Sequence, residues 1–365
     1  MKAKNILITG NEACGEGAIQ AGCRFYAGYP ITPQNELTAY MSRRMDEVEG
    51  VFIQAESEIA AINMVFGASL AGKRAMTSSS SPGISLKQEG ISYLAGCELP
   101  AVIVNIMRGG PGLGNIAPSQ SDYFQATKGG GHGDYHMIVL APASCQEMLD
   151  LTRIAFDLAD KYRNPVIILG DGVLGQMMEP VTIQENPNTQ DQKPKSWALT
   201  GAKVRKPNII RSLLLKEGEL EELNEKLQGK YNAVIKNEIK YENYKVDDAD
   251  IIIVSYGTSS RISKACVDRM RKENIKIGLF RPISLWPFPY KELKALDKGR
   301  TRFLTVEMSA GQMVEDVRLA IEDKKRVFFH GRTGGGIPTE EEIITKIKTQ
   351  CIQGKTSKAT GKKVT

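Results

Sequence analysis

The sequence has 365 residues, with 48 basic and 42 acidic side chains and a formal net charge of +6. Hydrophobic residues make up 41% and charged residues 25%, proportions that are typical of folded globular proteins and that exclude a disordered chain, a collagen-like repeat and a small disulfide-rich scaffold. At about 150 residues per domain, the length predicts roughly two domains.

The positive charge gathers at the end of the chain, where the last twelve residues hold four lysines and no acidic residue. We expect 351–365 to be a solvated basic tail rather than an arm that binds RNA or a partner. The pI therefore does not indicate a nucleic-acid partner.

The six cysteines are scattered and form no CxxC pair, so we predict no metal site and no iron–sulfur cluster on this chain. The first residues contain too short an apolar run for a signal peptide, and no run of about 18 apolar residues could span a membrane. These features predict a cytoplasmic protein with reduced thiols and no membrane partner.

Residues 1–180 alternate short apolar runs with amphipathic stretches. The runs are NILIT, RFYAGY, VFIQ, RAMTSS, AVIVNIM, MIVLA and PVIILG. This alternation predicts a parallel sheet covered by helices. In the helix predicted within SEIAAINMVFGASLAG, the inward face should consist of Ile59, Ile62, Phe66 and Leu70.

Residues 181–247 are more polar and contain prolines, followed by a charged helix with Leu220, Leu223 and Leu227 in one stripe. We interpret this range as a connecting arm that packs across a neighbouring domain or subunit, because it is too polar to form a core of its own. Residues 248–350 then alternate four apolar runs, ADIIIVSYG, IKIGLFRP, RFLTVEM and RVFFHG, with three amphipathic stretches, which predicts a second α/β domain.

Three reactive side chains follow predicted strands directly, at the sheet edge where parallel α/β folds bind ligands. Thr32 lies in YPITP, Glu58 in QAESEIA, and Arg108 at the end of AVIVNIM. The stiff YPITP loop could hold the Thr32 hydroxyl in place, or Thr32 could simply cap a helix that begins at Pro33.

Glu58 begins a helix whose other inward residues are Ala and Ile, so its carboxylate should be poorly solvated and available for a proton or a strong hydrogen bond. Glu56 is the rival candidate, and the alternative role is to complement the positive end of the helix. Arg108 precedes Gly109 and Gly110, where backbone could approach a ligand, and could grip a carboxylate with two hydrogen bonds; a structural salt bridge is the alternative.

Three other motifs carry less weight. The glycines of 10–22 lack the third glycine of a dinucleotide loop, and the GDG at 170–172 lacks the paired asparagines of a complete magnesium–diphosphate motif, so Asp171 is predicted to be a structural turn residue. His132 and His136 have helical metal spacing, but the surrounding glycines favour a loop that borders an active site.

With YPITP, QAESEIAA, TSSSSPGISLKQEGISYLAG and MRGGPGLGN, the chain resembles the α subunit of the 2-oxoacid:ferredoxin oxidoreductases, over both predicted domains to about residue 335. Within that family, GGPGLGN followed by SQSDYFQATKGGGHGDY is most similar to the 2-oxoisovalerate (3-methyl-2-oxobutanoate) enzymes. The resemblance implies an α/β fold in which a thiamine-enzyme pyrimidine-type domain precedes a transketolase C-terminal-like domain.

The resemblance also implies cofactors and partners. Thiamine diphosphate would lie between this chain and a β subunit, and that β subunit would carry the magnesium–diphosphate motif and an iron–sulfur cluster. A γ subunit and a ferredoxin-like δ subunit with further clusters would complete the complex. The reaction implied is oxidative decarboxylation of a 2-oxoacid, with coenzyme A as acyl acceptor and ferredoxin as electron acceptor.

Carried over by resemblance, Glu58 matches the glutamate that hydrogen-bonds the aminopyrimidine of the cofactor and favours its imino tautomer. Thr32 matches the hydroxyl near cofactor and substrate, and Arg108 matches the arginine that binds the 2-oxoacid carboxylate. The implied cofactor loop is Tyr29, Pro30, Ile31 and Thr32, and the implied substrate residues are Arg108, Thr32, Gly109, Gly110 and His132.

Three alternatives stay open. A pyruvate or 2-oxoglutarate enzyme would share the motifs, although no cation follows Arg108 until Lys128 to bind a distal carboxylate, which favours an apolar substrate tail. A non-catalytic module could keep the fold without the chemistry. The β chain of a lipoamide-dependent dehydrogenase would share both domain types but is not expected to carry YPITP.

Overall fold

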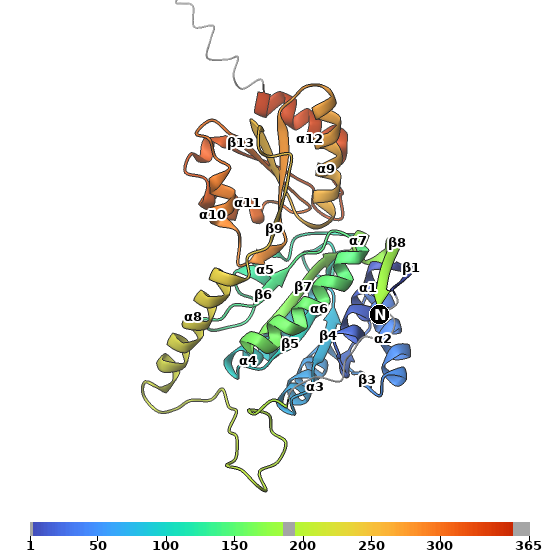
Figure 1. The fold of residues 1–365 in the computed structure, drawn as a ribbon, viewed down its shortest axis with the longest axis vertical. Coiled ribbons are helices and arrows are strands. Elements are labelled where there is room, and N and C mark those ends of the chain that lie inside the picture. Colours follow the sequence, from blue (N-terminus) through green and yellow to red (C-terminus); the bar gives the residue numbers. More distant parts are fainter. Residues whose placement is uncertain (1–2, 185–193, 353–365) are drawn as a thin grey trace, which may run out of the picture.

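The computed structural model describes residues 3–184 and 194–352, so most of the predicted basic tail lies outside the described residues. Two parallel sheets, each covered by helices, lie one above the other in Figure 1, and we call them the large sheet and the small sheet. The α/β class predicted from the alternating pattern is confirmed. In the two described ranges, no helix is both long and apolar enough to cross a membrane.

The large sheet has the strand order β12-β6-β7-β5-β4-β2-β3. Its strands are β2 (Phe25–Gly28), β3 (Val51–Gln54), β4 (Ala75–Ser79), β5 (Ala101–Met107), β6 (Ile138–Leu140), β7 (Pro165–Asp171) and β12 (Ser284–Trp286). All pairs are parallel except β12 with β6. Strands β5 and β7 are buried along their whole length, as expected for nearly continuous apolar runs covered on both faces.

Helices cover both faces of the large sheet. They are α1 (Gly10–Gln20), α2 (Asn35–Glu47), α3 (Glu58–Leu70), α4 (Ser81–Gly96), α5 (Tyr123–Thr127), α6 (Cys145–Tyr162) and α7 (Gly172–Gln176). Residues of β5 alternate between two cores: Ile103 packs in the core that contains α3 and α4, whereas Val102 and Val104 pack in the core that contains α1, α2 and α6.

The predicted inward face of α3 needs a correction. Ile59 is 51% exposed, and the buried stripe instead runs through Glu58, Ile62, Val65 and Ser69. These positions are four, three and four residues apart, which is the spacing of one helical face, so Glu58 rather than Ile59 begins the buried stripe.

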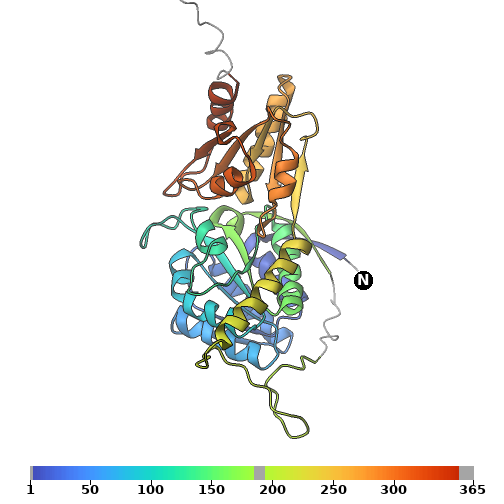
Figure 2. The ribbon, with the colours of Figure 1, turned by 90° about the vertical axis from the view of Figure 1, so that its left-hand side faces the viewer.

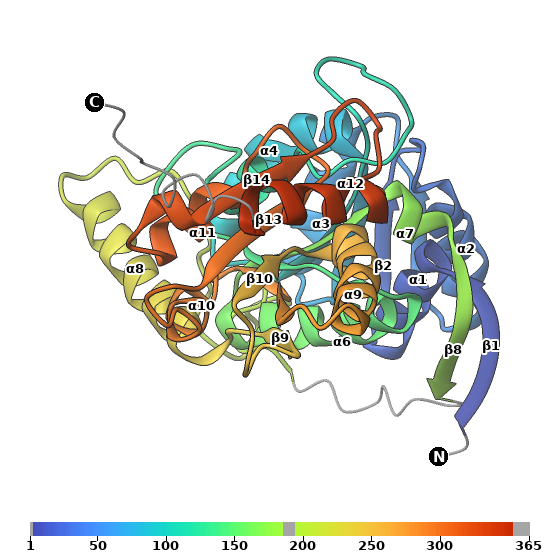
Figure 3. The same ribbon diagram turned by 90° about the horizontal axis from the view of Figure 1, so that it is seen from above.

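The first apolar run is not part of the parallel sheet, contrary to prediction. Strand β1 (Ala3–Thr9) pairs antiparallel with β8 (Met178–Gln184) in a separate two-stranded ribbon, seen side by side in Figure 3. Only one side of this ribbon packs on the core, with Ile8 and Val181 buried and Leu7 61% exposed.

The small sheet has the order β14-β13-β10-β11-β9. Its elements are β9 (Tyr241–Tyr244), β10 (Ile251–Val254), α9 (Gly257–Lys272), β11 (Ile277–Pro282), α10 (Tyr290–Ala295), β13 (Arg302–Glu307), α11 (Met313–Ala320), a 3-10 turn (Lys324–Arg326), β14 (Val327–Gly331), α12 (Glu340–Lys346) and a π-helical turn (Ile347–Ile352). The four strands and three helices predicted in this range are all present. Strand β9 is an antiparallel addition from the range predicted as the arm.

The charged helix of the arm is α8 (Glu219–Asn237), which lies obliquely across the large-sheet half in Figure 2. Its buried residues are Leu227, Tyr231 and Val234, whereas the predicted stripe residue Leu220 is 50% exposed. The Tyr231 ring contacts the rings of His136 and Trp286, so the arm packs where β12 joins the large sheet.

Candidate active site

Four neighbouring strands of the large sheet, β3, β2, β4 and β5, end at the same edge. The residues that follow them are Glu58 after β3, the loop Tyr29–Thr32 after β2, Ser80 and Ser81 after β4, and Arg108 after β5. The connection from β2 leads to β3 on one side, while β4 lies on the other side of β2. This reversal of direction is the position at which open α/β sheets bind ligands.

Glu58 is a buried carboxylate at the start of α3. The residue is 5% exposed, whereas Glu56 is exposed, so burial distinguishes the two candidates. Ser57 caps the helix by accepting a hydrogen bond from the Ala60 backbone. The Glu58 carboxylate is therefore not needed as the helix cap. None of the described residues donates a hydrogen bond to the Glu58 carboxylate, and its oxygens keep some contact with solvent, so a ligand can still reach them.

Thr32 does not cap helix α2. The helix begins at Asn35, with Gln34 at the capping position, so Pro33 is not its first residue either. The Thr32 hydroxyl instead accepts a hydrogen bond of 3.3 Å from Asn35 Nδ2. The preceding Tyr29 and Pro30 are exposed, with Ile31 partly exposed.

Arg108 joins the loop after β2 to the loop after β5. Its Nη1 donates to the Thr32 carbonyl at 3.0 Å and its Nη2 donates to the Leu113 carbonyl at 3.1 Å, while Nε is buried without a partner. Among the described residues, no carboxylate lies within 4.0 Å of its guanidinium, so the alternative of a structural salt bridge finds no support. A guanidinium has five N–H donors, and those left unused can bind an external carboxylate.

A polar cluster beneath Arg108 could not be inferred from the sequence. Ser81 Oγ accepts from the Arg108 backbone at 3.0 Å and donates to Asp122 Oδ2 at 2.6 Å, and Asn105 Nδ2 donates to the same oxygen at 2.9 Å. Burial raises the pKa of Asp122, and the hydrogen bonds from Ser81 and Asn105 oppose that rise. The only sequence signal was the position of Ser81 directly after a strand.

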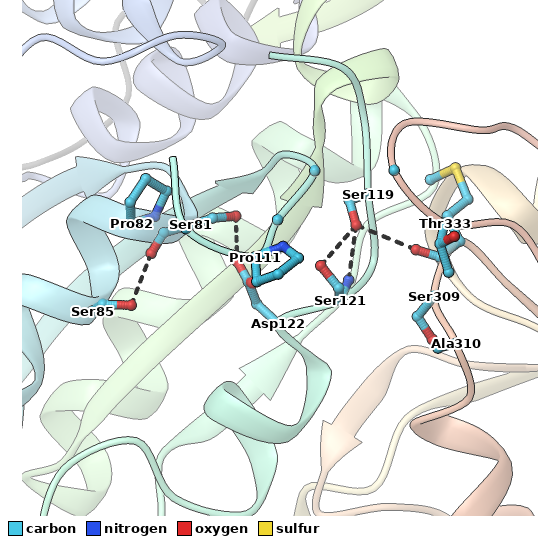
Figure 4. A pocket seen from close by; sticks show the side chains of 15 residues that line it. Ser81, Pro82, Ser85, Pro111, Ser119, Ser121, Asp122, Ser309, Ala310 and Thr333 are labelled. Atoms are coloured by element: carbon cyan, nitrogen blue, oxygen red, sulfur yellow. Dashed lines mark hydrogen bonds between the residues drawn. The ribbon is translucent and has the colours of Figure 1, made fainter. Parts of the chain in front are cut away.

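A pocket of about 520 Å³ opens beside this cluster, between the large sheet and the small sheet. Figure 4 shows Ser81, Asp122 and Pro111 on one side and Ser309, Ala310 and Thr333 on the other. The predicted substrate residues Gly109 and Gly110 line it, whereas Thr32 and Arg108 lie outside its lining.

His132 lies away from these residues. It is exposed, its carbonyl accepts from Ser92 Oγ, and its ring meets the Tyr93 ring edge-on. Ser92 is eleven residues beyond Ser81 on α4, or about 16 Å along the helix. Within this chain, the structure therefore does not bring His132 to the strand-end site. His136 is stacked on Trp286.

The glycine-rich motifs have structural roles. Asp171 of the GDG sequence caps α7 through the backbone of Val173 and Leu174 and accepts from Thr258 Oγ1 at 2.8 Å, which ties the large-sheet half to helix α9. Burial raises its pKa, and these hydrogen bonds oppose the rise. The glycines of 10–22 lie mostly within helix α1 rather than in a phosphate-binding loop.

Comparison with solved structures first defines the fold. A split-gene transketolase superposes with a TM-score of 0.60 at 14% identity, covering 94% of this chain and 98% of that one, so the arrangement of the two sheets is of the transketolase type. Residues 16–242 match the model of the thiamine diphosphate-binding domain of pyruvate flavodoxin/ferredoxin oxidoreductases, and residues 249–343 match core domain II of pyruvate:ferredoxin oxidoreductase. The chain belongs to the 2-oxoacid:ferredoxin oxidoreductase family, and the predicted resemblance is confirmed.

Individual relatives differ in their similarity to this chain. Ketoisovalerate oxidoreductase subunit VorB of Methanothermobacter marburgensis is 54% identical over 94% of this chain and 97% of its own length. The 2-oxoglutarate synthase subunit KorA of the same organism is 37% identical over 93% of this chain and 97% of its own length. The structure of 2-oxoglutarate:ferredoxin oxidoreductase from Magnetococcus marinus, with 2-oxoglutarate, coenzyme A and succinyl-CoA bound, has a TM-score of 0.84 at 31% identity, covering 95% of this chain and 65% of that one.

Proposed function

We propose that this chain is the α subunit of a complex that oxidatively decarboxylates 2-oxoisovalerate (ketoisovalerate) to an acyl-CoA and carbon dioxide, with thiamine diphosphate as cofactor and ferredoxin as electron acceptor. The observation that carries the proposal is the buried, unpartnered Glu58 carboxylate at the same sheet edge as Thr32 and Arg108. The similarity to ketoisovalerate oxidoreductase subunits supports the choice of substrate.

The residues of this edge fit thiamine diphosphate. The Glu58 side chain is largely buried, but its carboxylate is open to a ligand and no described residue donates to it, so an aminopyrimidine ring can take up its acceptor positions. Bound thiamine diphosphate supplies the electron sink that decarboxylation of a 2-oxoacid needs. Glu58 would hold the pyrimidine ring and exchange a proton with it, while the loop Tyr29–Thr32 shapes the adjoining wall.

Arg108 would bind the substrate carboxylate. Its two hydrogen bonds to the Thr32 and Leu113 carbonyls fix the guanidinium plane before substrate arrives, so little side-chain freedom remains to be lost on binding. Gly109 and Gly110 let the backbone beside it approach the ligand. The absence of a cation between Arg108 and Lys128 suits the branched apolar tail of 2-oxoisovalerate.

The diphosphate and its Mg²⁺ require another subunit. The Asp171 carboxylate caps helix α7 and accepts from Thr258, and the residue is buried, so these structural contacts compete with any metal ion for it. All six cysteines are buried and free, which leaves no cluster ligands exposed on the described surface. We therefore assign the Mg²⁺ and iron–sulfur sites to β and δ subunits, with a separate γ subunit.

Replacement of Glu58 tests the proposal. Glu58→Gln keeps the size of the side chain but cannot take up a proton, so turnover by the assembled complex should fall at least about a hundredfold. Glu56→Gln, an exposed carboxylate two residues away, is the matched control and should keep full activity. Normal turnover by an assembled Glu58→Gln complex would contradict the assignment, and the non-catalytic alternative would then gain support.

Substrate preference is tested by specificity constants for 2-oxoisovalerate, 2-oxoglutarate and pyruvate in the anaerobically purified complex. We expect kcat/KM to be highest for 2-oxoisovalerate. The same preparation should contain iron, thiamine diphosphate and a partner chain with a complete magnesium–diphosphate motif. Reduction of lipoamide instead of ferredoxin would identify the dehydrogenase alternative.

A further inference from the structure

Lys87 is a buried lysine in the middle of helix α4. Its side chain has no solvent exposure, and its ammonium donates one hydrogen bond of 3.0 Å, to Thr77 Oγ1 on β4. In the described part of the chain, no carboxylate lies within 4.0 Å of it to form a direct ion pair. Burial of an amine is costly, so its presence between a helix and a sheet calls for a compensating charge.

The geometry places that charge at Glu58. Gly83 lies four residues before Lys87, and thus on the same face of α4. A β carbon built on Gly83 would come within 2.5 Å of Glu58 Oε1 and 2.0 Å of Ser79 Oγ, so the backbone of α4 lies directly on the Glu58 side chain and on β4 at this point.

Strand β4, which faces this side of α4, also brings two residues to the same place. Thr77, which binds the Lys87 ammonium, and Ser79, which touches Gly83, are two residues apart on β4 and therefore on one face of it. Helical side chains lean toward the N-terminus, so the Lys87 side chain points from its own turn toward the Gly83 turn, where Glu58 lies. The Ser79 hydroxyl is buried and lacks a hydrogen-bond partner within the described ranges.

The electrostatics agree with this arrangement. Burial lowers the pKa of Lys87 to about 8, and the Glu58 charge opposes that fall. Glu58 is the charged group that acts on Lys87. At neutral pH the Lys87 side chain is therefore mostly an ammonium, and its charge interacts with that of Glu58.

We propose that Lys87 is a positioning residue for catalysis, whose buried ammonium is the counter-charge of the Glu58 carboxylate when that carboxylate bonds the pyrimidine ring of the cofactor. This inference rests on the proposed function of Glu58. Lys87→Met would remove the positive charge that interacts with the Glu58 carboxylate and would leave that carboxylate in a largely buried setting without it.

The first test is a double-mutant cycle on the assembled complex without cofactor, measured as the shift of the thermal unfolding midpoint. Lys87→Met should lower the midpoint by several degrees, and adding Glu58→Gln to that variant should restore part of the loss, because the unpaired carboxylate is removed. Lys230→Met is the matched control: burial also lowers the pKa of Lys230 to about 8, but its neighbour is Glu98 at 3.6 Å. Its effect should add to that of Glu58→Gln.

The second test is the pH profile of kcat/KM. In Lys87→Met the acid limb should move upward by about one pH unit or more, and Lys87→Arg, which restores the charge, should return it toward the wild-type position. If Lys87→Met does not assemble, Lys87→Gln and Lys87→Arg take its place in both tests.

The role of Lys87 would be overturned by two results together: midpoint shifts of Lys87→Met and Glu58→Gln that simply add in the double variant, and an acid limb of the kcat/KM profile that does not move in Lys87→Met. Coupled midpoints in a complex whose Glu58→Gln variant is fully active would instead support the Lys87–Glu58 pair while refuting the proposed function of Glu58. The two proposals can therefore fail separately.

Discussion

Within residues 3–184 and 194–352, the Arg108 guanidinium bonds only backbone carbonyls, which makes its replacement informative. A lysine could not reach the Thr32 and Leu113 carbonyls and still present two donors to a carboxylate. We expect Arg108→Lys to lower kcat/KM for 2-oxoisovalerate by about 10- to 100-fold, mostly through KM, which corresponds to the loss of about 1.5–3 kcal/mol from a charged hydrogen bond.

The control for this variant is Arg300→Lys, whose arginine side chain is 84% exposed and far along the chain from the site. It should leave both kinetic constants unchanged. An Arg108→Lys complex with wild-type KM would remove Arg108 from the substrate site.

At the scale of single residues, position relative to a strand was enough to select Thr32, Glu58 and Arg108 as candidates, and the structure brings Thr32 and Arg108 into direct contact. The choice between Glu58 and Glu56 needed the buried face of α3. The Ser81 cluster needed contacts between segments well separated in sequence, which local patterns do not encode.

At the scale of elements, helix α1 shows why its glycines resemble a nucleotide motif. A β carbon on Gly17 would lie 2.4 Å from the Leu149 carbonyl of α6, so the glycine permits close packing of two helices. We expect Gly17→Ala to lower the free energy of unfolding by about 1–3 kcal/mol, because the two backbones must move apart. Chemical denaturation of the complex measures this change.

Gly229 provides the opposite case within α8. Apart from its own helix backbone and chain neighbours, no described atom lies within 4 Å of a β carbon built there. Gly229→Ala therefore only replaces a poor helix former by a good one, and it should raise the free energy of unfolding by up to about 1 kcal/mol. If Gly17→Ala and Gly229→Ala changed the free energy of unfolding equally, the packing of α1 against α6 would not require a glycine at position 17.

Most helices and strands followed from hydrophobic periodicity, because each has enough residues to show its period. The strands that escaped prediction, or were placed in the wrong sheet, are β1, β8, β9 and β12. Each pairs antiparallel at an edge, and the identity of its partner depends on chain segments far away. Periodicity indicates that a segment is extended but not which neighbour it finds.

At the scale of the whole molecule, Arg281 ties the two halves together. From β11 its guanidinium donates two hydrogen bonds, of 2.8 and 2.7 Å, to Glu147 on α6 and one of 2.8 Å to Glu242 on β9. Arg281→Met removes the cationic partner of Glu147 and leaves Glu242 with Lys264 as its described cation, and it should cost about 2–4 kcal/mol. Arg269→Met, which breaks an exposed pair with Glu341, should change stability by less than about 0.5 kcal/mol.

The same link predicts a pH dependence. Burial raises the pKa of Glu242, but Arg281 and Lys264 outweigh this effect and hold the pKa below its usual value. A carboxyl group of this kind stabilises the fold above its unfolded pKa of about 4.3, and the contribution is lost as the pH falls through the lower folded value. The difference in thermal unfolding midpoint between wild type and Arg281→Met should therefore shrink below about pH 4. A difference that stays constant with pH would contradict this role of Arg281.

Strand β12 covers the outer edge of β6, although the two strands come from opposite halves of the chain. An uncovered edge of a sheet offers free backbone donors and acceptors to any other strand, and is a common starting point for aggregation. While the protein is being synthesised, that edge stays open until the ribosome has passed residue 286, even when every other strand of the large sheet has been made. The C-terminal half therefore protects this edge only once residue 286 has been made, and separate expression of the first half should give a self-associating product.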